Sequence, residues 1–217
     1  MRMRRNPDAV AYLDEAKCLV EPEGMAGKWK EKLGGKALHV EIGTGKGGYS
    51  LELAKMHPDE AFIAVERNDT AAGLAARRYD EEGLPNLALI HADAGTIETW
   101  FADGEVDVIH LNFSDPWPKK RNAKRRLSSK SFLEAYKKIL AREGELIQKT
   151  DNPDLFDYSL ETLQENGFAI LAEDRDFRSE PHEEDPCTEY ETKFMQQGQP
   201  IYRLTARLDP DQSKEVA

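Results

Sequence analysis

Short apolar runs alternate with amphipathic stretches along most of the chain. The apolar runs, rich in Val, Ile, Leu and Ala, predict strands, and the stretches between them carry apolar residues at helical spacing. The expected strands span residues 37–42, 61–66, 87–91, 106–112, 144–149, 168–172 and 200–208. The expected helices span residues 47–56, 69–82, 96–101, 129–141 and 153–166, the last opened by Asn-Pro and ended by Asn-Gly.

This alternation predicts a Rossmann-like α/β fold with a mostly parallel, doubly wound, seven-stranded sheet and helices on both faces. A chain of 217 residues can bury a sizeable core as one domain, so we expect a single domain over residues 1–217. Residues 1–30 are expected to form a basic N-terminal extension with a lead-in helix. Residues 209–217 are expected to be a frayed tail.

Acidic residues lie at or just after five of the predicted strand ends. Ligands of doubly wound sheets bind beyond the carboxyl ends of the strands, so acids gathered there indicate a site. Taken singly, each acid is more simply explained as a helix cap or a turn residue, and this applies above all to Asp93 and Asp151. The five residues, in chain order, are Glu41, Glu66, Asp93, Asp115 and Asp151.

Composition narrows the cellular setting. No apolar run approaches the roughly 20 residues of a membrane helix, and the basic segment Met1–Pro7 leads into no apolar core of a secretory signal. We therefore expect a cytoplasmic protein without a membrane partner. The two cysteines, Cys18 and Cys187, form no CxxC motif, so neither a disulfide framework nor a metal site is expected.

The segment Gly43-Thr-Gly45-Lys-Gly47-Gly48 follows the first predicted strand and matches the G-x-G-x-x-G pattern of dinucleotide sites. In such a site the turn holds an anionic pyrophosphate, which Glu41 would repel. S-adenosylmethionine instead carries an ammonium and a sulfonium, so an acid here favours that methyl donor. Glu66 is placed for ribose hydroxyls and Asp93 for the adenine amino group, which fits either cofactor. A purely structural turn is the third interpretation.

The fourth predicted strand is followed by Asp115-Pro116-Trp117-Pro118. Each proline fixes its own φ and restrains the preceding residue, so the loop is stiff and can aim the Asp115 carboxylate. Trp117 offers a face on which a base can stack, a contact worth roughly 1 to 3 kcal/mol in single-stranded recognition. The alternative is that Trp117 belongs to the core and Asp115 caps a turn.

A net charge of -11 argues against a nucleic-acid partner, but the charge is segregated. Six of the eight residues from Lys119 to Arg126 are cations, directly after the stiff loop. Such a run can be a solvated face, yet at this place it can also grip phosphates without reading sequence. We therefore expect a nucleic-acid substrate. The cations are Lys119, Lys120, Arg121, Lys124, Arg125 and Arg126.

Four motifs together carry a resemblance over nearly the whole chain. They are Glu41-Ile-Gly-Thr-Gly, Asp115-Pro-Trp-Pro-Lys-Lys-Arg, Lys149-Thr-Asp151 and Thr188-Glu-Tyr-Glu-Thr-Lys-Phe. The chain resembles the bacterial tRNA (guanine-N7)-methyltransferases. The glycine turn is common to most methyltransferases, whereas the second and fourth motifs are much more specific. The resemblance implies transfer of a methyl group from S-adenosylmethionine to N7 of the variable-loop guanine of tRNA, position 46. The sequence itself gives no sign of an obligate protein partner.

The resemblance also implies residue roles at the matching positions. Asp115 would be the catalytic residue. N7 of guanine carries a lone pair and needs no strong base, so the chemistry asks for a carboxylate that orients the guanine and favours the cationic product; the residues leave open whether Asp115 or Asp151 holds the Watson-Crick edge. The donor site would comprise Glu41, Gly43, Gly45, Glu66, Asp93 and Asp115. The target nucleotide would be contacted by Lys119, Asp151, Thr188, Glu189, Tyr190 and Glu191, and RNA by Arg121, Lys124, Arg125 and Arg126.

Three other functions stay open on the residues alone. The Asp115-Pro116-Trp117 loop also suits a methyltransferase that acts on an amino group of a base. An RNA-binding module could hold S-adenosylmethionine without turnover, and the glycine pattern leaves room for a dinucleotide oxidoreductase. Near the end of the chain, Tyr190 and Phe194 could be packing residues rather than part of the pocket.

Overall fold

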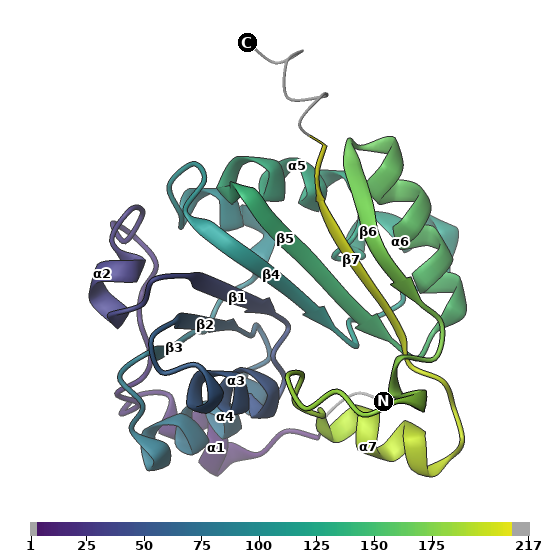
Figure 1. The fold of residues 1–217 in the computed structure, drawn as a ribbon. Helices are drawn as coiled ribbons and strands as arrows, with labels where there is room; N and C mark the ends of the chain where they lie inside the picture. The colour runs from purple at the N-terminus through teal and green to yellow at the C-terminus, as the bar shows by residue number, and fades with distance from the viewer. Residues whose placement is uncertain (1–3, 210–217) are drawn as a thin grey trace. The chain divides into compact units, whose positions relative to one another are not determined.

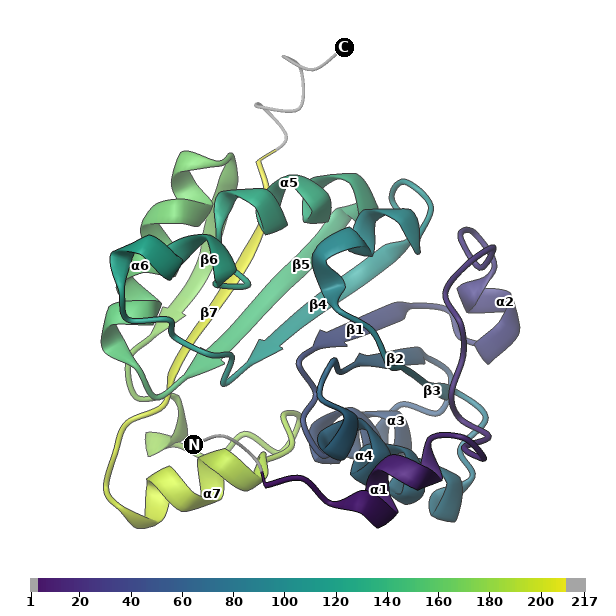
Figure 2. The ribbon, with the colours of Figure 1, turned by 180° about the vertical axis from the view of Figure 1, so that it is seen from behind.

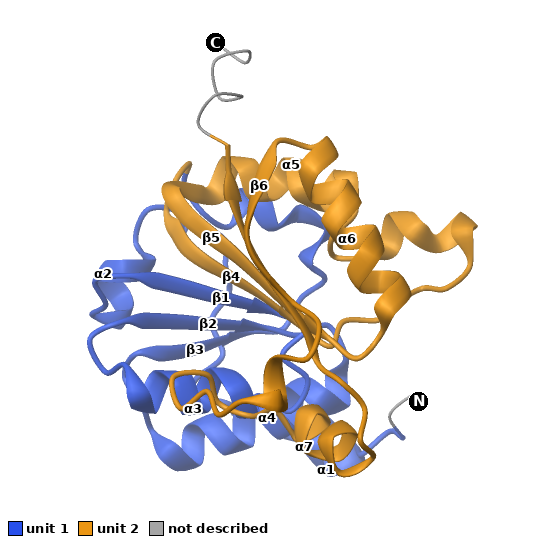
Figure 3. Ribbon diagram, turned by 45° about the vertical axis from the view of Figure 1, so that its right-hand side comes forward, with its two compact units in different colours: residues 1–102 blue, residues 103–217 orange. Residues whose placement is uncertain are grey.

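The computed structural model describes residues 4–209, and the chain forms two compact units, residues 1–102 (unit 1) and 103–217 (unit 2) (Figure 3). Within the described residues, seven strands belong to one sheet, three from unit 1 and four from unit 2. Inside the units, every strand pair is parallel except the two pairs that the last strand makes. The predicted α/β fold with a mostly parallel, seven-stranded sheet is confirmed. No helix among residues 4–209 is long and apolar enough to cross a membrane.

Unit 1 contains a three-stranded parallel sheet in the order β3-β2-β1. The central strand β2 is buried at every position, which explains its unbroken apolar sequence, because a parallel strand is covered on both faces. The elements of unit 1 are α1 (Pro7–Tyr12), α2 (Trp29–Leu33), β1 (Leu38–Ile42), α3 (Gly48–Met56), β2 (Ala61–Val65), α4 (Asp69–Glu82), β3 (Leu87–Ile90) and a 3-10 helix, η1 (Ala94–Thr99).

The first helix, α1, packs directly against α4. Asn6 caps α1 and donates its backbone N–H to Thr70 of α4 at 3.1 Å. The contact is so close that a Cβ at Gly73 would overlap the carbonyl group of Ala9, so only glycine fits there. At the other end of the contact, the carboxylate of Asp80 accepts the hydroxyl of Tyr12. The N-terminal segment is therefore integrated into unit 1 from Asn6 onward.

Unit 2 contains a four-stranded mixed sheet in the order β4-β5-β7-β6. The last strand among the described residues, β7, is antiparallel to both of its neighbours and lies between them, as Figures 1 and 2 show from opposite sides. The elements of unit 2 are β4 (Val106–Asn112), a 3-10 helix η2 (Lys120–Arg125), α5 (Lys130–Ile139), β5 (Leu140–Thr150), α6 (Pro153–Glu165), β6 (Phe168–Asp174), a 3-10 helix η3 (Phe177–Ser179), α7 (Glu189–Gln196) and β7 (Tyr202–Leu208).

Some element boundaries differ from the prediction for identifiable reasons. The helix expected at 96–101 is a 3-10 helix that begins at Ala94, because the Asp93 side chain accepts the N–H of Gly95 and starts it early. The strand expected at 144–149 begins at Leu140, which pairs with Val106 before a shift in register. The predicted tail beyond Asp209 and the first three residues lie outside the described residues.

Candidate functional site

In unit 1, the glycine turn follows β1 and is tied to the end of β2. Gly43 and Thr44 both donate their N–H groups to the carbonyl of Val65, at 2.8 and 3.1 Å. Gly43 and Gly45 have φ values of 81° and 60°, a region that favours glycine. The two glycines named from the sequence therefore shape a turn whose backbone is fixed by the neighbouring strand.

Glu41 lies beneath this turn and is 4% exposed. Its Oε2 accepts the hydroxyls of Thr44 and Ser50, each at 2.6 Å. The hydroxyl of Tyr79 lies 3.5 Å from that of Thr44, and burial together with the charge of Glu41 raises the pKa of Tyr79 far above its ordinary value. The Tyr79 phenol therefore stays neutral.

Glu66, directly after β2, reaches the same turn. Its Oε2 accepts the N–H of Gly45 at 2.9 Å, and its Oε1 accepts the N–H of Asn68 at 2.8 Å. Asp93 occupies a more open place after β3, where it caps η1 and pairs with Arg67 at 3.3 Å. Unit 1 thus brings Glu41 and Glu66 to one turn, while Asp93 is an exposed cap whose carboxylate faces solvent.

In unit 2, the loop after β4 contains two non-glycine residues in the left-handed region. Phe113 has a φ of 50° and Trp117 a φ of 42°, so the loop is bent on both sides of Asp115, which is exposed. Phe113 donates its N–H to the carbonyl of Lys149 at 2.8 Å. Trp117 is partly buried and lies under the guanidinium of Arg125, 4.9 Å from the ring centroid.

The basic run that follows includes η2, and its side chains differ in exposure. Most of its cations, including Lys119, are exposed. Arg126 is half-buried: its Nε donates to the carbonyl of Pro116 at 2.9 Å and its Nη2 to that of Trp117 at 3.3 Å. One residue of the run therefore contacts the loop backbone while its neighbours face water. The exposed cations are Lys119, Lys120, Arg121, Lys124 and Arg125.

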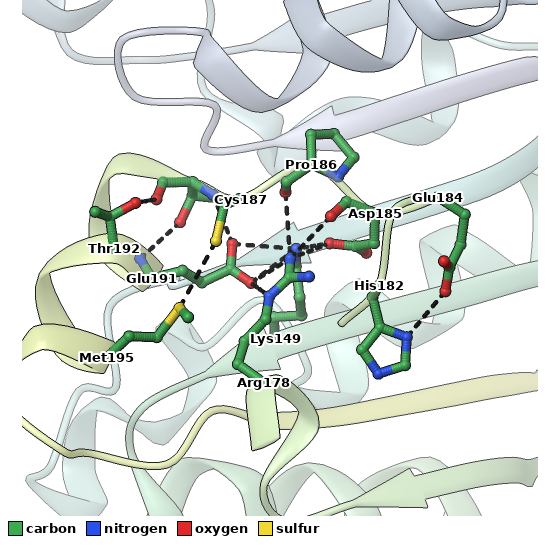
Figure 4. Close-up of polar contacts among 11 residues, drawn as sticks. Lys149, Arg178, His182, Glu184, Asp185, Pro186, Cys187, Glu191, Thr192 and Met195 are labelled. Atoms are coloured by element: carbon green, nitrogen blue, oxygen red, sulfur yellow. Dashed lines mark hydrogen bonds and ion pairs between the residues drawn. The ribbon is translucent and has the colours of Figure 1, made fainter. Parts of the chain in front are cut away.

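A buried ion cluster joins the end of β5 to the segment before α7 (Figure 4). Lys149 is completely buried and pairs with Asp185 and, at 3.2 Å, with Glu191. Arg178 donates to the same two acids, at 2.6 Å to Asp185 and 2.9 Å to Glu191. Burial alone would lower the pKa of Arg178, but the charges of Glu191 and Asp185 raise it. The two cations and two anions compensate each other away from water.

Glu191 also closes the capping box of α7. Its Oε2 accepts the N–H of Thr188 at 2.7 Å, and its own N–H donates to the Thr188 hydroxyl at 3.0 Å. The two residues between them, at the first turn of α7, face outward: Glu189 is exposed, and Tyr190 is 55% exposed. The rings of Tyr190 and Phe113 are stacked with centroids 6.1 Å apart. The four-residue motif thus has two buried members that fix the helix start and two that face outward.

Asp151 follows β5 and is half-buried. The cap of α6 is Asn152, whose Oδ1 accepts the N–H of Leu155 at 2.8 Å, so capping does not account for Asp151. The roles of Arg178 and Asp185 cannot be read from the sequence, because their pairing depends on a fold that brings η3 and the loop before α7 onto Lys149. Among residues 4–209, no three His, Cys, Asp or Glu side chains are grouped as metal ligands.

The comparisons with known proteins cover nearly the whole chain. Residues 35–204 match a family model described as a putative methyltransferase. A tRNA (guanine-N(7)-)-methyltransferase of Geobacillus kaustophilus is 43% identical over 98% of this chain and 100% of that protein. The protein of the same description from Geobacillus thermodenitrificans is 42% identical over the same shares.

Solved structures show the same fold at low identity. A methyltransferase dependent on S-adenosylmethionine (SAM) from Aquifex aeolicus matches with a TM-score of 0.58 and 17% identity, over 94% of this chain and 100% of that one. The antibiotic-resistance methyltransferase Kmr matches with a TM-score of 0.59 and 21% identity, over 83% of this chain and 91% of that one. Both likenesses concern the fold.

Proposed function

The chain belongs to the tRNA (guanine-N(7)-)-methyltransferase family of SAM-dependent enzymes, and from this premise we propose that it methylates N7 of the guanine at position 46, in the variable loop of tRNA. The observation that carries the proposal is the bent Asp115 loop, which continues at once into a run of exposed cations. A carboxylate next to a phosphate-binding surface suits a reaction on a base within RNA.

Within unit 1, the donor site consists of Glu41 near the end of β1, the two glycines of the turn that follows, and the acids Glu66 and Asp93 after β2 and β3. The chemistry of these groups fits SAM: Glu41 sets a negative charge under the turn, and Glu66 has acceptor capacity for ribose hydroxyls beyond its two backbone hydrogen bonds. Asp93 accepts from the adenine amino group. SAM, when bound, supplies a methyl group on a positively charged sulfur.

Asp115 orients the acceptor base. Guanine presents its N1–H and its exocyclic amine as two adjacent donors, and an exposed carboxylate on a stiff loop accepts both. N7 holds a lone pair and no proton, so no residue has to act as a base. The chain contributes alignment of the base and a negative charge that stabilises the positive charge developing on it.

The target nucleotide is held by Lys119, Asp151 and the start of α7. Tyr190 and Glu189 face outward and contact the nucleotide directly, with Thr188 beside them. Glu191 is fully buried, so its contribution is to fix the helix start from which the others project. The exposed cations Arg121, Lys124 and Arg125 grip the phosphates of the tRNA in the cytoplasm.

The decisive experiment uses an unmodified tRNA transcript with guanine at position 46 and SAM labelled on its methyl group. We expect the label in 7-methylguanosine after nucleoside digestion, and none when position 46 is changed to adenine. Label in an amino-methylated nucleoside would instead indicate the base-amino reaction. Binding of RNA and donor without transfer would indicate a binding module, and saturable binding of NADH would indicate a dinucleotide enzyme.

A further inference from the structure

We propose that Arg126 is a positioning residue that holds the catalytic loop, and that it is not one of the cations that grip RNA; this rests on the proposed function. Its guanidinium donates to the carbonyl of Pro116 at 2.9 Å and to that of Trp117 at 3.3 Å. These carbonyls belong to the two residues that follow Asp115 in the chain. An arginine that fixes both of them fixes the direction in which the Asp115 carboxylate points.

The guanidinium of Arg126 is held by the protein along one edge and over one face. Nε and Nη2 both donate to loop carbonyls, and one face of the group lies over the ring of Tyr158, 4.1 Å from its centroid. Arg125, the preceding residue, is exposed, and its guanidinium lies over the Trp117 ring. Two adjacent arginines of one basic run therefore have different surroundings.

The backbone that carries Arg126 is itself anchored. Arg126 donates its N–H to the carbonyl of Ala123 and accepts the N–H of Ser129, each at 3.0 Å. Two residues further on, the buried hydroxyls of Ser128 and Ser159 are 2.7 Å apart, which ties this segment to α6. The arginine thus reaches the loop from a fixed base.

The loop needs such a contact because of its backbone. Trp117 has a backbone φ of 42°. Residues other than glycine rarely adopt such a φ, and it persists only where the surrounding structure imposes it. Arg126 donates to the carbonyls of Pro116 and Trp117, which lie on either side of the Trp117 Cα, and these two hydrogen bonds hold that conformation in place. On the other side of Asp115, Phe113 is fixed by its bond to Lys149 and by its stacking on Tyr190 and Phe194. Asp115 is therefore held between two fixed points.

The test compares Arg126→Lys and Arg126→Ala with Arg125→Ala. Lysine keeps the charge but cannot make the two-pronged contact, so we expect kcat to fall roughly 10- to 100-fold, as misplacement of a reacting group does, while the Kd for tRNA and its salt dependence stay as in the unaltered protein. Arg125→Ala should weaken tRNA binding and reduce the slope of log K against log salt by roughly 0.7 to 0.9. If Arg126→Ala weakened binding and reduced the slope as Arg125→Ala does, Arg126 would be an RNA contact and the proposal would be overturned.

A second measurement needs neither RNA nor donor. The chain has three tryptophans, so 5-fluorotryptophan labelling gives three fluorine resonances, and Trp117→Phe identifies the one in the loop. We expect Arg126→Lys to broaden or split the Trp117 resonance and to leave those of the buried Trp29 and Trp100 unchanged. Arg121→Lys, in an exposed position of the same run, is the matched control. An unchanged Trp117 resonance would overturn the positioning role of Arg126 even if the unaltered enzyme methylates tRNA. A changed resonance would support that role even if N7 were not the methylated atom.

Discussion

The backbone N–H of Gly45 donates to Glu66 Oε2 at 2.9 Å, so the glycine turn and the acid after β2 form one unit. The other carboxylate oxygen accepts the N–H of Asn68 at 2.8 Å. A carboxylate oxygen can accept more than one hydrogen bond, and each oxygen of Glu66 therefore keeps capacity for a ribose hydroxyl. The acid is fixed in place by the protein alone.

Glu66→Gln should weaken binding of S-adenosylhomocysteine about 10-fold or more. The amide offers one accepting oxygen, and its NH2 group would face the backbone N–H of Gly45 or Asn68; hydrogen bonds to charged groups are worth roughly 1.5 to 3 kcal/mol. Isothermal titration calorimetry measures the loss. Glu82→Gln, at the exposed end of α4, is the control. Equal affinity in the two variants would exclude Glu66 from the donor site.

Asp115→Ala should abolish methyl transfer to tRNA while leaving binding of S-adenosylhomocysteine largely intact. The exposed carboxylate is removed without disturbing any buried contact, and Asp115→Asn keeps its shape while replacing one acceptor by a donor group. Single-turnover assays with labelled donor measure the transfer step. Near-normal turnover by both variants would contradict the catalytic role.

The double variant Arg121→Ala, Lys124→Ala should weaken tRNA binding and flatten its salt dependence. Both side chains are exposed, and each phosphate contact that is lost reduces the slope of log K against log salt by about 0.7 to 0.9. Filter binding at several salt concentrations gives the slope. Lys137→Ala, on α5 and paired with Glu134, serves as a control cation. A slope equal to that of the unaltered protein would make the run an ordinary solvated surface.

Lys149→Met should destabilise the chain strongly, by about 3 to 5 kcal/mol, because it leaves two buried acids with one cation. Adding Glu191→Gln restores the balance of charge, with Arg178 and Asp185 still paired. The double variant should therefore lose less than the sum of the two single losses, as measured by urea unfolding. Additive losses would show that the four charges act independently.

The contribution of Asp80 to stability should depend on pH. Burial alone would raise the pKa of Asp80, but the N–H groups of Lys17 and Cys18 and the hydroxyl of Tyr12 hold it below the ordinary value. A lowered pKa in the folded state means that the stabilisation is present above the unfolded-state pKa of about 3.9 and is lost as pH falls through the folded-state pKa. The difference in unfolding free energy between the unaltered protein and Asp80→Asn should therefore narrow from about pH 6 to about pH 3.5. A constant difference would contradict this assignment.

The strands could be predicted because their signal is local. Ala61–Val65 is buried on both faces and reads as an unbroken apolar run, and α4 was expected over the same residues that it occupies, since Asn68 caps its start and Gly83 ends it. The short helices depend on less visible signals. The helices expected from the sequence do not include the basic run, whereas Lys120–Arg125 forms a 3-10 helix.

The candidate site was predictable where chemistry and chain order coincide. Glu41 lies near the end of β1 and Glu66 directly after the parallel strand β2, and both contact the same turn. Arg178 could not be assigned to Glu191 from the sequence, because charged side chains in an acidic segment normally face water and only the fold buries this pair. Likewise, nothing in the sequence distinguishes Arg126, which donates to two loop carbonyls, from Arg125, which lies over the Trp117 ring.

The position of β7 between β5 and β6 has a consequence for how unit 2 is made. Tyr202–Leu208 leaves the ribosome after the other strands that the structure describes, yet it pairs with both β5 and β6 and so joins them. Until then, β6 has no strand partner and β5 exposes an unpaired edge, the kind of surface that invites association between chains. A truncation before Tyr202 should therefore yield an aggregating polypeptide, because unit 2 cannot close its sheet during synthesis and must wait for its final segment.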